Sequence, residues 1–125
     1  MKLVWIFIGG GTGSIMRYLL GVWLNRAEFL MPYGTFTANV AGSFLIGLIA
    51  GWMMMRNMLH SPWAYLLVIG FLGGFTTFSS FTFEGLTFIR QNNWELFFAY
   101  FFSTLILGMF AVAFGFYVSR ILASF

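Results

Sequence analysis

Long stretches without a charged side chain constrain this sequence more than any other feature. Three long stretches and one shorter one lack Asp, Glu, Lys and Arg, and they cover residues 3–16, 29–55, 57–83 and 96–119. A membrane-spanning helix needs about 20 consecutive, mostly apolar residues. We therefore predict four transmembrane helices, at roughly residues 3–24, 33–55, 63–90 and 95–119.

The same composition excludes most classes of soluble protein. Only 7% of the residues are charged, whereas an ordinary soluble domain carries about 25%. The chain has no Cys for a disulfide framework, and it has no basic stripe of the kind that binds nucleic acid. Because backbone groups in lipid must be hydrogen-bonded within their own segment, apolar runs of this length form helices. We predict an all-α membrane protein in which residues 1–125 form one four-helix domain.

The basic residues at the ends of the predicted helices and in their connections divide almost evenly between the two sides of the membrane. Three lie on one side and two on the other, namely Lys2, Arg56 and Arg120, and then Arg26 and Arg90. Orientation follows the Lys/Arg asymmetry of short loops, so this sequence hardly specifies one. Either an insertion factor or Arg17 decides the orientation, or both orientations form and pair antiparallel as a closed dimer.

The third predicted helix is too long to be one regular span. Residues 63–90 would extend about 42 Å as a helix, whereas the hydrocarbon core is about 30 Å thick. Near the centre lies the segment Gly73-Gly74-Phe75-Thr76-Thr77-Phe78-Ser79-Ser80-Phe81. Glycine tolerates irregular backbone, and hydroxyl side chains satisfy freed amides. The pattern predicts a break near the bilayer midplane, where carbonyls duplicated by a two-fold axis suit a small cation.

This segment has two interpretations. In the first, the glycines form a packing surface and the hydroxyls bond back to carbonyls four residues earlier. In the second, Phe75, Phe78 and Phe81 recur at i, i+3 and i+6, on nearly one face and beside the hydroxyls. The edge of a phenyl ring carries partial positive charge, so this stripe favours a path for an anion.

One side-chain amide lies inside the second predicted helix, within Gly34-Thr35-Phe36-Thr37-Ala38-Asn39-Val40-Ala41-Gly42-Ser43-Phe44. A polar side chain in lipid faces the bundle interior or a water path. Asn39 therefore either forms an interhelical hydrogen bond or donates its N–H to an anion. Small residues four apart indicate close helix contacts, and they occur at Gly9–Gly13, Ala38–Gly42 and Gly47–Gly51.

Other polar residues inside the predicted helices are Arg17, Glu84, Tyr100 and Thr104. Arg17 either snorkels to the interface or lines a vestibule that attracts anions. Glu84 is expected near the interface, with proton coupling as the alternative. Tyr100 and Thr104 are one turn apart and extend a polar track along the fourth helix, with Ser103 as the neighbouring alternative.

Three blocks of residues follow one another in the chain. They are Gly9-Gly10-x-x-Gly13-x-x-x-Arg17-Tyr18, Gly34-Thr35-Phe36-x-x-Asn39-x-x-Gly42-Ser43-Phe44 and Gly70-Phe71-x-Gly73-Gly74-Phe75-Thr76-Thr77-Phe78-Ser79-Ser80-Phe81. In this order the blocks resemble those of the small dual-topology fluoride channels, called the Fluc or CrcB-like family. The resemblance covers all four helices, and the third block is very specific.

The resemblance implies an antiparallel homodimer in the bacterial inner (plasma) membrane, with two pores that pass fluoride passively out of the cytoplasm. It implies that Phe78 and Phe81 face the permeating ion and that Asn39 is a pore residue. It also implies that the backbone carbonyls of Gly73 and Thr76 hold a structural sodium ion at the dimer centre.

Other positions match the family's pattern less completely. Tyr100 and Thr104 are similar to a polar track of the family, although Gly108 replaces a hydroxyl that some members carry. Arg17 corresponds to the family's first-helix arginine, which we assign to the vestibule. A tightly hydrated anion must exchange water for other donors. The residues expected to supply them, besides Phe ring edges, are Asn39 and the hydroxyls of Thr77, Ser79 or Ser80.

Two other functions fit the length and charge balance. A small dual-topology, proton-coupled multidrug exporter would need a carboxylate within the membrane, and Glu84 is the one candidate. A membrane assembly subunit that transports nothing is the other alternative. An enzyme is not expected, because the sequence has no Cys, no Asp and one His, and no paired carboxylates.

Overall fold

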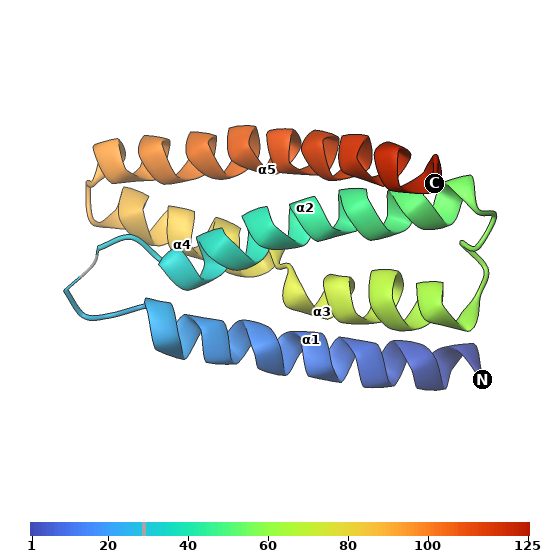
Figure 1. The fold of residues 1–125 in the computed structure, drawn as a ribbon. Helices are drawn as coiled ribbons and strands as arrows, with labels where there is room; N and C mark the ends of the chain where they lie inside the picture. Colours follow the sequence, from blue (N-terminus) through green and yellow to red (C-terminus); the bar gives the residue numbers. More distant parts are fainter. Residues whose placement is uncertain (29) are drawn as a thin grey trace.

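Four membrane-spanning segments make up the fold, and the third is interrupted (Figure 1). The computed structural model describes residues 1–28 and 30–125, and these residues form helices without any strand. The elements are α1 (Lys2–Leu24), α2 (Tyr33–Met55), η1 (Ala64–Leu72), α3 (Gly73–Phe75), α4 (Phe78–Arg90) and α5 (Trp94–Ala123). Each of the four segments is long and apolar enough to cross a membrane. The predicted all-α membrane fold is therefore confirmed.

The element boundaries agree closely with the predicted ones, with one difference at the end of the chain. α5 continues to Ala123, past the predicted end at residue 119. The predicted span ended just before Arg120, because a charged side chain marks the point where the chain leaves the hydrocarbon region. A charge ends the apolar segment without ending the helix, and Arg120 lies in the last turn of α5, where it complements the helix dipole.

The third span differs from a regular α-helix in two ways. Its first half, η1, is wound as a π-helix, whose hydrogen bonds join residues five apart. After the short α3 the chain is extended at Thr76 and Thr77, with φ and ψ of −83° and 154° and of −150° and 120°, before α4 begins. The predicted break is therefore present, and it occupies two residues.

Glycines allow the backbones of neighbouring helices to touch. A methyl group on Gly9 or Gly13 of α1 would overlap the carbonyl oxygens of Leu66 and Phe71 in the third span. One on Gly74 would likewise overlap the carbonyl of Gly10. Side chains larger than hydrogen are thus excluded from this contact. The Gly9–Gly13 pair therefore does what its spacing predicts, and it fixes α1 against the segment that ends at the break.

A second glycine contact joins α2 to α5. A methyl group on Gly47 would overlap the carbonyl of Val112, and one on Gly115 would overlap the carbonyl of Phe44. In Figure 1 these two helices lie side by side over most of their length, and the end of α3 and the start of α4 lie near the middle of α2. The break therefore lies beside α2, about halfway along the bundle.

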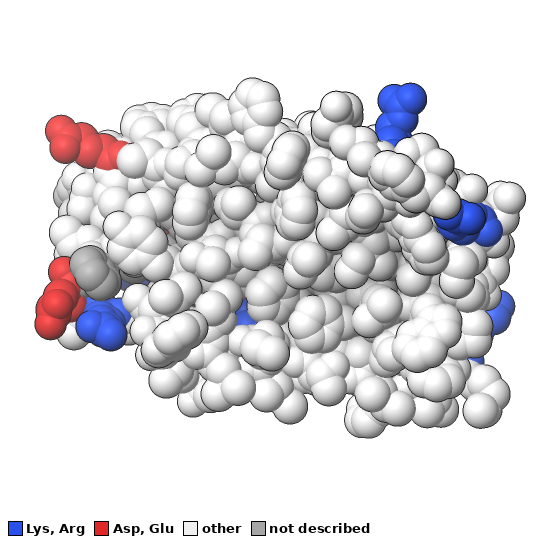
Figure 2. Space-filling view, in the orientation of Figure 1, with Lys and Arg blue, Asp and Glu red and all other residues white. Residues whose placement is uncertain are grey.

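Most charged side chains gather at the two ends of the molecule, and the broad surface between them is almost free of charge (Figure 2). Both chain termini lie at one end, and the connections before α2 and after α4 lie at the other (Figure 1). Many large apolar side chains of the helices are exposed, including Phe7, Phe110 and Tyr117 at 81%, 70% and 61%. Membrane lipid is the solvent that such a surface requires.

Candidate functional site

The side chain of Asn39 pairs with the extended backbone at the break. Its Nδ2 donates to the carbonyl oxygen of Thr77 at 2.9 Å, and its Oδ1 accepts from the Thr77 N–H at 2.7 Å. An amide has two N–H donors, and among the described contacts the second N–H of Asn39 has no protein acceptor. Asn39 thus forms the interhelical hydrogen bond that was one of its two interpretations, and it retains a donor for the other.

Two threonines close the helix ends on either side of the break. The backbone N–H and the hydroxyl of Thr76 both donate to the Leu72 carbonyl, at 3.0 and 2.9 Å. The hydroxyl of Thr77 accepts from the Ser80 N–H at 3.2 Å, which caps the first turn of α4. The same hydroxyl donates to the Ser80 hydroxyl at 3.2 Å and lies 3.3 Å from that of Ser79. These hydroxyls therefore bond mainly to one another and to backbone.

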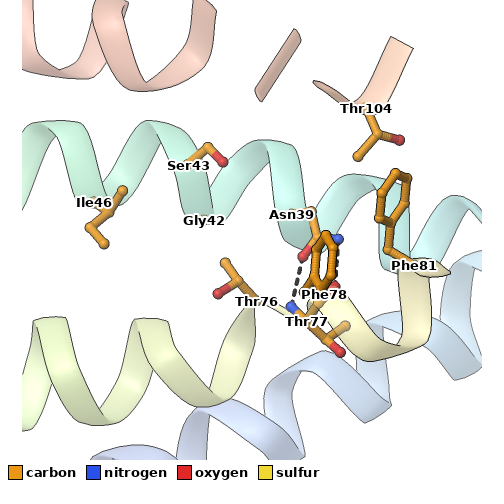
Figure 3. Close-up of a pocket in the computed structure, with 9 residues that line it drawn as sticks. All are labelled: Asn39, Gly42, Ser43, Ile46, Thr76, Thr77, Phe78, Phe81 and Thr104. Carbon is orange, nitrogen blue, oxygen red and sulfur yellow. Dashed lines mark hydrogen bonds between the residues drawn. The ribbon is translucent and has the colours of Figure 1, made fainter. Parts of the chain in front are cut away.

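Beside the break lies an open groove of about 320 Å³ (Figure 3). Its walls come from α2, the break, the start of α4 and α5, and the lining residues are Asn39, Gly42, Ser43, Ile46, Thr76, Thr77, Phe78, Phe81 and Thr104. Of the predicted pathway residues, Asn39, Thr77, Phe78, Phe81 and Thr104 line this groove. Ser79, Ser80, Tyr100 and Arg17 do not.

Ser43 also lines the groove, and no functional role was predicted for it from the sequence. No hydrogen bond of its hydroxyl is found among the described residues, whereas the hydroxyls of Thr76 and Thr104 donate to backbone carbonyls. A Cβ on Gly108 would lie 3.6 Å from the Ser43 Oγ. Ser43 follows Asn39 by about one helical turn, which is the sequence signal that places both on the same wall.

Phe78 and Phe81 lie together, but they differ in exposure. Their ring centroids are 6.1 Å apart, and Phe78 is 75% exposed whereas Phe81 is 3% exposed. Phe81 packs against Tyr100 and Phe101, each at 5.3 Å between centroids. Phe75 does not share their face, because the break intervenes, and it stacks on Phe71 at 5.7 Å. The predicted stripe of three rings is therefore wrong for Phe75.

The carboxylate of Glu84 links α4, on which it lies, to α2 and α5. Glu84 accepts from the Thr35 hydroxyl at 2.7 Å and from the Tyr100 hydroxyl at 2.6 Å, so each of its oxygens has a partner. Tyr100 is fully buried, and the Thr104 hydroxyl donates to its carbonyl at 2.7 Å. Tyr100 and Thr104 are therefore linked through backbone, and only Thr104 reaches the groove.

Arg17 lies beside the break in the third span rather than at an end of the bundle. Its Nε donates to the Gly74 carbonyl at 3.1 Å, and the Ser14 hydroxyl approaches the same oxygen at 3.4 Å. By contrast, the carbonyls of Gly73 and Thr76 accept no hydrogen bond among those of the described residues. Gly73 is exposed, and a Cβ placed on it would meet no atom within 4 Å.

Within the described residues no three His, Cys, Asp or Glu side chains come together as a metal centre. Among the described residues, the carbonyl oxygens of Gly73 and Thr76 are backbone oxygens at the break that accept no hydrogen bond. Unwound backbone carbonyls are the ligands that membrane proteins use for alkali cations.

A four-span bundle whose broken third helix faces a small polar and aromatic groove defines a class of small membrane transport protein. A family model described as "CrcB-like protein, Camphor Resistance (CrcB)" matches residues 4–116. The chain belongs to this family. The match does not favour the multidrug exporter.

Curated relatives match nearly the whole chain. A protein from Gloeothece citriformis is 39% identical over 122 residues, which are 96% of this chain and 98% of the relative. A protein from Solibacter usitatus is 42% identical over 121 residues, at 96% and 99% coverage. A protein from Caulobacter vibrioides is 41% identical over 121 residues, at 95% of each. Each relative carries the name "Fluoride-specific ion channel FluC".

The pairing of Asn39 with Thr77 predicts a loss of stability on Asn39→Ala. This change leaves the N–H and the carbonyl of Thr77 without hydrogen-bond partners, and each unsatisfied group lowers the free energy of unfolding by about 1–3 kcal/mol. We expect a clear fall in the thermal unfolding midpoint of the detergent-purified protein. Ser43→Ala, on the same wall of the groove, removes no internal hydrogen bond and changes the midpoint little. Equal midpoints for the two variants would contradict this account of Asn39.

Proposed function

We propose that the chain is a fluoride-selective channel of the bacterial inner membrane, which lets fluoride leave the cytoplasm passively and so lowers its concentration there. The observation that carries the proposal is the groove beside the break, because it combines a free amide N–H, a free hydroxyl and two phenylalanines. The names of the curated relatives support it, since each is called a fluoride-specific ion channel.

The groove suits a small anion on electrostatic grounds. Fluoride must exchange part of its hydration shell for other donors, and it must bind weakly enough to leave. Asn39 and Ser43 supply an N–H and an O–H that no acceptor among the described residues uses, and the ring edges of Phe78 and Phe81 add partial positive charge. The groove has no lysine or arginine in its lining. The anion therefore meets dipoles and not a full charge that would hold it.

The functional unit is an antiparallel pair of chains. Phe78 is largely exposed beside the groove, and the hydroxyl residues Ser79 and Thr82 are exposed on the same helix. Polar groups at membrane depth face other protein or water, so this surface of α4 requires a cover. A second copy in the opposite orientation supplies one and brings a second Phe78 to the break, which supports two pathways per pair.

A sodium ion completes the centre of this pair. Two unpartnered carbonyls from each chain, those of Gly73 and Thr76, meet near the two-fold axis and provide four oxygens for a hard cation. The ion has a structural role: it neutralises the carbonyl dipoles that the break exposes and holds the two breaks in register.

Replacing Phe81 tests the aromatic part of the pathway. Phe81→Ile keeps an apolar side chain but removes the ring edge, so fluoride efflux from liposomes, followed with a fluoride electrode, should fall about tenfold or more. Phe102→Ile on α5, whose side chain is 52% exposed and does not line the groove, should leave efflux unchanged. Efflux through Phe81→Ile at the unsubstituted rate would count against the proposal.

Dual topology is tested with single cysteines, because the sequence has none. His60→Cys and Gln91→Cys place one thiol in connections at opposite ends of the molecule. A membrane-impermeant maleimide added to intact cells should label about half of each variant, since the Lys/Arg bias is nearly absent. Permeabilised cells should give complete labelling. Full labelling of one variant and none of the other would establish a single orientation instead.

The sodium proposal predicts a cation requirement. Fluoride efflux should fall when sodium is replaced on both sides by N-methylglucamine, because four converging carbonyl dipoles repel one another without a cation. Restoring sodium should restore efflux. The same rate in the two media would refute a functional sodium ion, while leaving fluoride transport itself unaffected.

A further inference from the structure

Two side chains on one face of α1 donate to a single backbone carbonyl of the third span. Gly10, Ser14 and Arg17 follow at i, i+4 and i+7, the spacing of one helix face. Gly10 is in backbone contact with Gly74, and Ser14 and Arg17 both donate to the Gly74 oxygen. This face of α1 therefore packs on Gly74 in α3, and two of its side chains satisfy the Gly74 carbonyl.

That carbonyl needs a partner because the helix stops. The last four carbonyls of a helix lose their intrahelical donors, and α3 ends at Phe75. Leu72 is satisfied by Thr76 from within the segment, whereas Gly74 is satisfied from α1. A guanidinium at a helix C-terminus also complements the negative end of the dipole.

We propose that Arg17 is a positioning residue, which caps the first half of the third span and thereby fixes where the break begins. By holding the Gly74 carbonyl toward α1, it leaves the carbonyls of Gly73 and Thr76 as the unpartnered ones. It also orients Thr77 toward Asn39. This role differs from attraction of anions in a vestibule, because it depends on donor geometry at one oxygen and not on charge alone.

Hydrogen exchange tests the cap without reference to transport. In the purified protein, Arg17→Met should speed exchange of the Thr76 and Thr77 amides about tenfold or more, since a hydrogen bond to a charged group is lost. Arg17→Lys, which keeps a charged donor, should lie between Arg17→Met and the unsubstituted chain. Arg26→Met removes an exposed arginine outside the helices and should change nothing at the break. Unchanged exchange at Thr76 and Thr77 in a folded Arg17→Met protein would overturn the proposal.

Fluoride efflux separates this role from anion attraction, and this second readout rests on the proposed function. A positioning role predicts that Arg17→Met lowers the maximal efflux rate at saturating fluoride, with the half-saturating concentration and the dependence on ionic strength unchanged. Attraction predicts a raised half-saturating concentration and weaker salt dependence, and that result would overturn the proposal. Absence of efflux from the unsubstituted chain would refute the fluoride channel but leave the exchange test standing.

Ser14→Ala covers the case in which Arg17→Met does not fold. Ser14 contributes the longer of the two contacts to Gly74, so its loss should speed exchange at the break only severalfold. Combined with Arg17→Lys, the two effects should depart from additivity, because both side chains share one acceptor. Independent effects would show that they do not act on the same carbonyl and would contradict the proposed cap.

Discussion

Two hydrogen bonds between the side-chain amide of Asn39 and the backbone of Thr77 are the contacts on which the rest of the site depends. Non-helical backbone within a membrane-spanning segment is tolerated only where it is buried in protein or lines a water-filled cavity. Asn39, from α2, satisfies both the N–H and the carbonyl of Thr77, one of the two extended residues. The chain can then start a new helix at Phe78 in the position that places Phe78 and Phe81 on the groove.

The groups that no internal contact satisfies point to what the single chain lacks. The carbonyls of Gly73 and Thr76, the second N–H of Asn39 and the hydroxyl of Ser43 have no hydrogen-bond partner among the described residues. The two carbonyl oxygens carry partial negative charge and suit a cation. The amide N–H and the hydroxyl are hydrogen-bond donors and suit an anion. The sodium ion and the permeating fluoride ion that we propose would meet both needs at one break, without a charged side chain in the groove lining.

Much of the fold follows from the sequence, because it depends on local patterns. The lengths of the charge-free stretches predicted the four spans. The paired glycines and the adjacent hydroxyls predicted the break, because glycine tolerates irregular backbone and hydroxyl side chains satisfy the amides that a break frees in lipid. The Gly9–Gly13 spacing predicted a close helix contact for α1, although not that the third span is its partner. The lone amide at Asn39 indicated a partner across helices, although not which one.

The details of the site required the tertiary structure. The helical register of Phe75, Phe78 and Phe81 assumed one continuous helix, and the break separates Phe75 from the others. Whether a hydroxyl faces inward or bonds to its own backbone depends on its rotamer and neighbours, and this distinguishes Ser43 from Thr104. Arg17 and Glu84 lie where they do because their partners, Gly74 and Tyr100, come from other elements.

The most direct test of the account compares fluoride with chloride in the unsubstituted protein. Liposomes that contain the purified chain and equal internal concentrations of the two anions are followed with two ion-selective electrodes, with potassium and valinomycin carrying the counter-charge. The account predicts rapid efflux of fluoride, little efflux of chloride and no requirement for a proton gradient. Equal efflux of the two anions, or fluoride efflux only when a proton gradient drives it, would contradict a passive fluoride-selective channel.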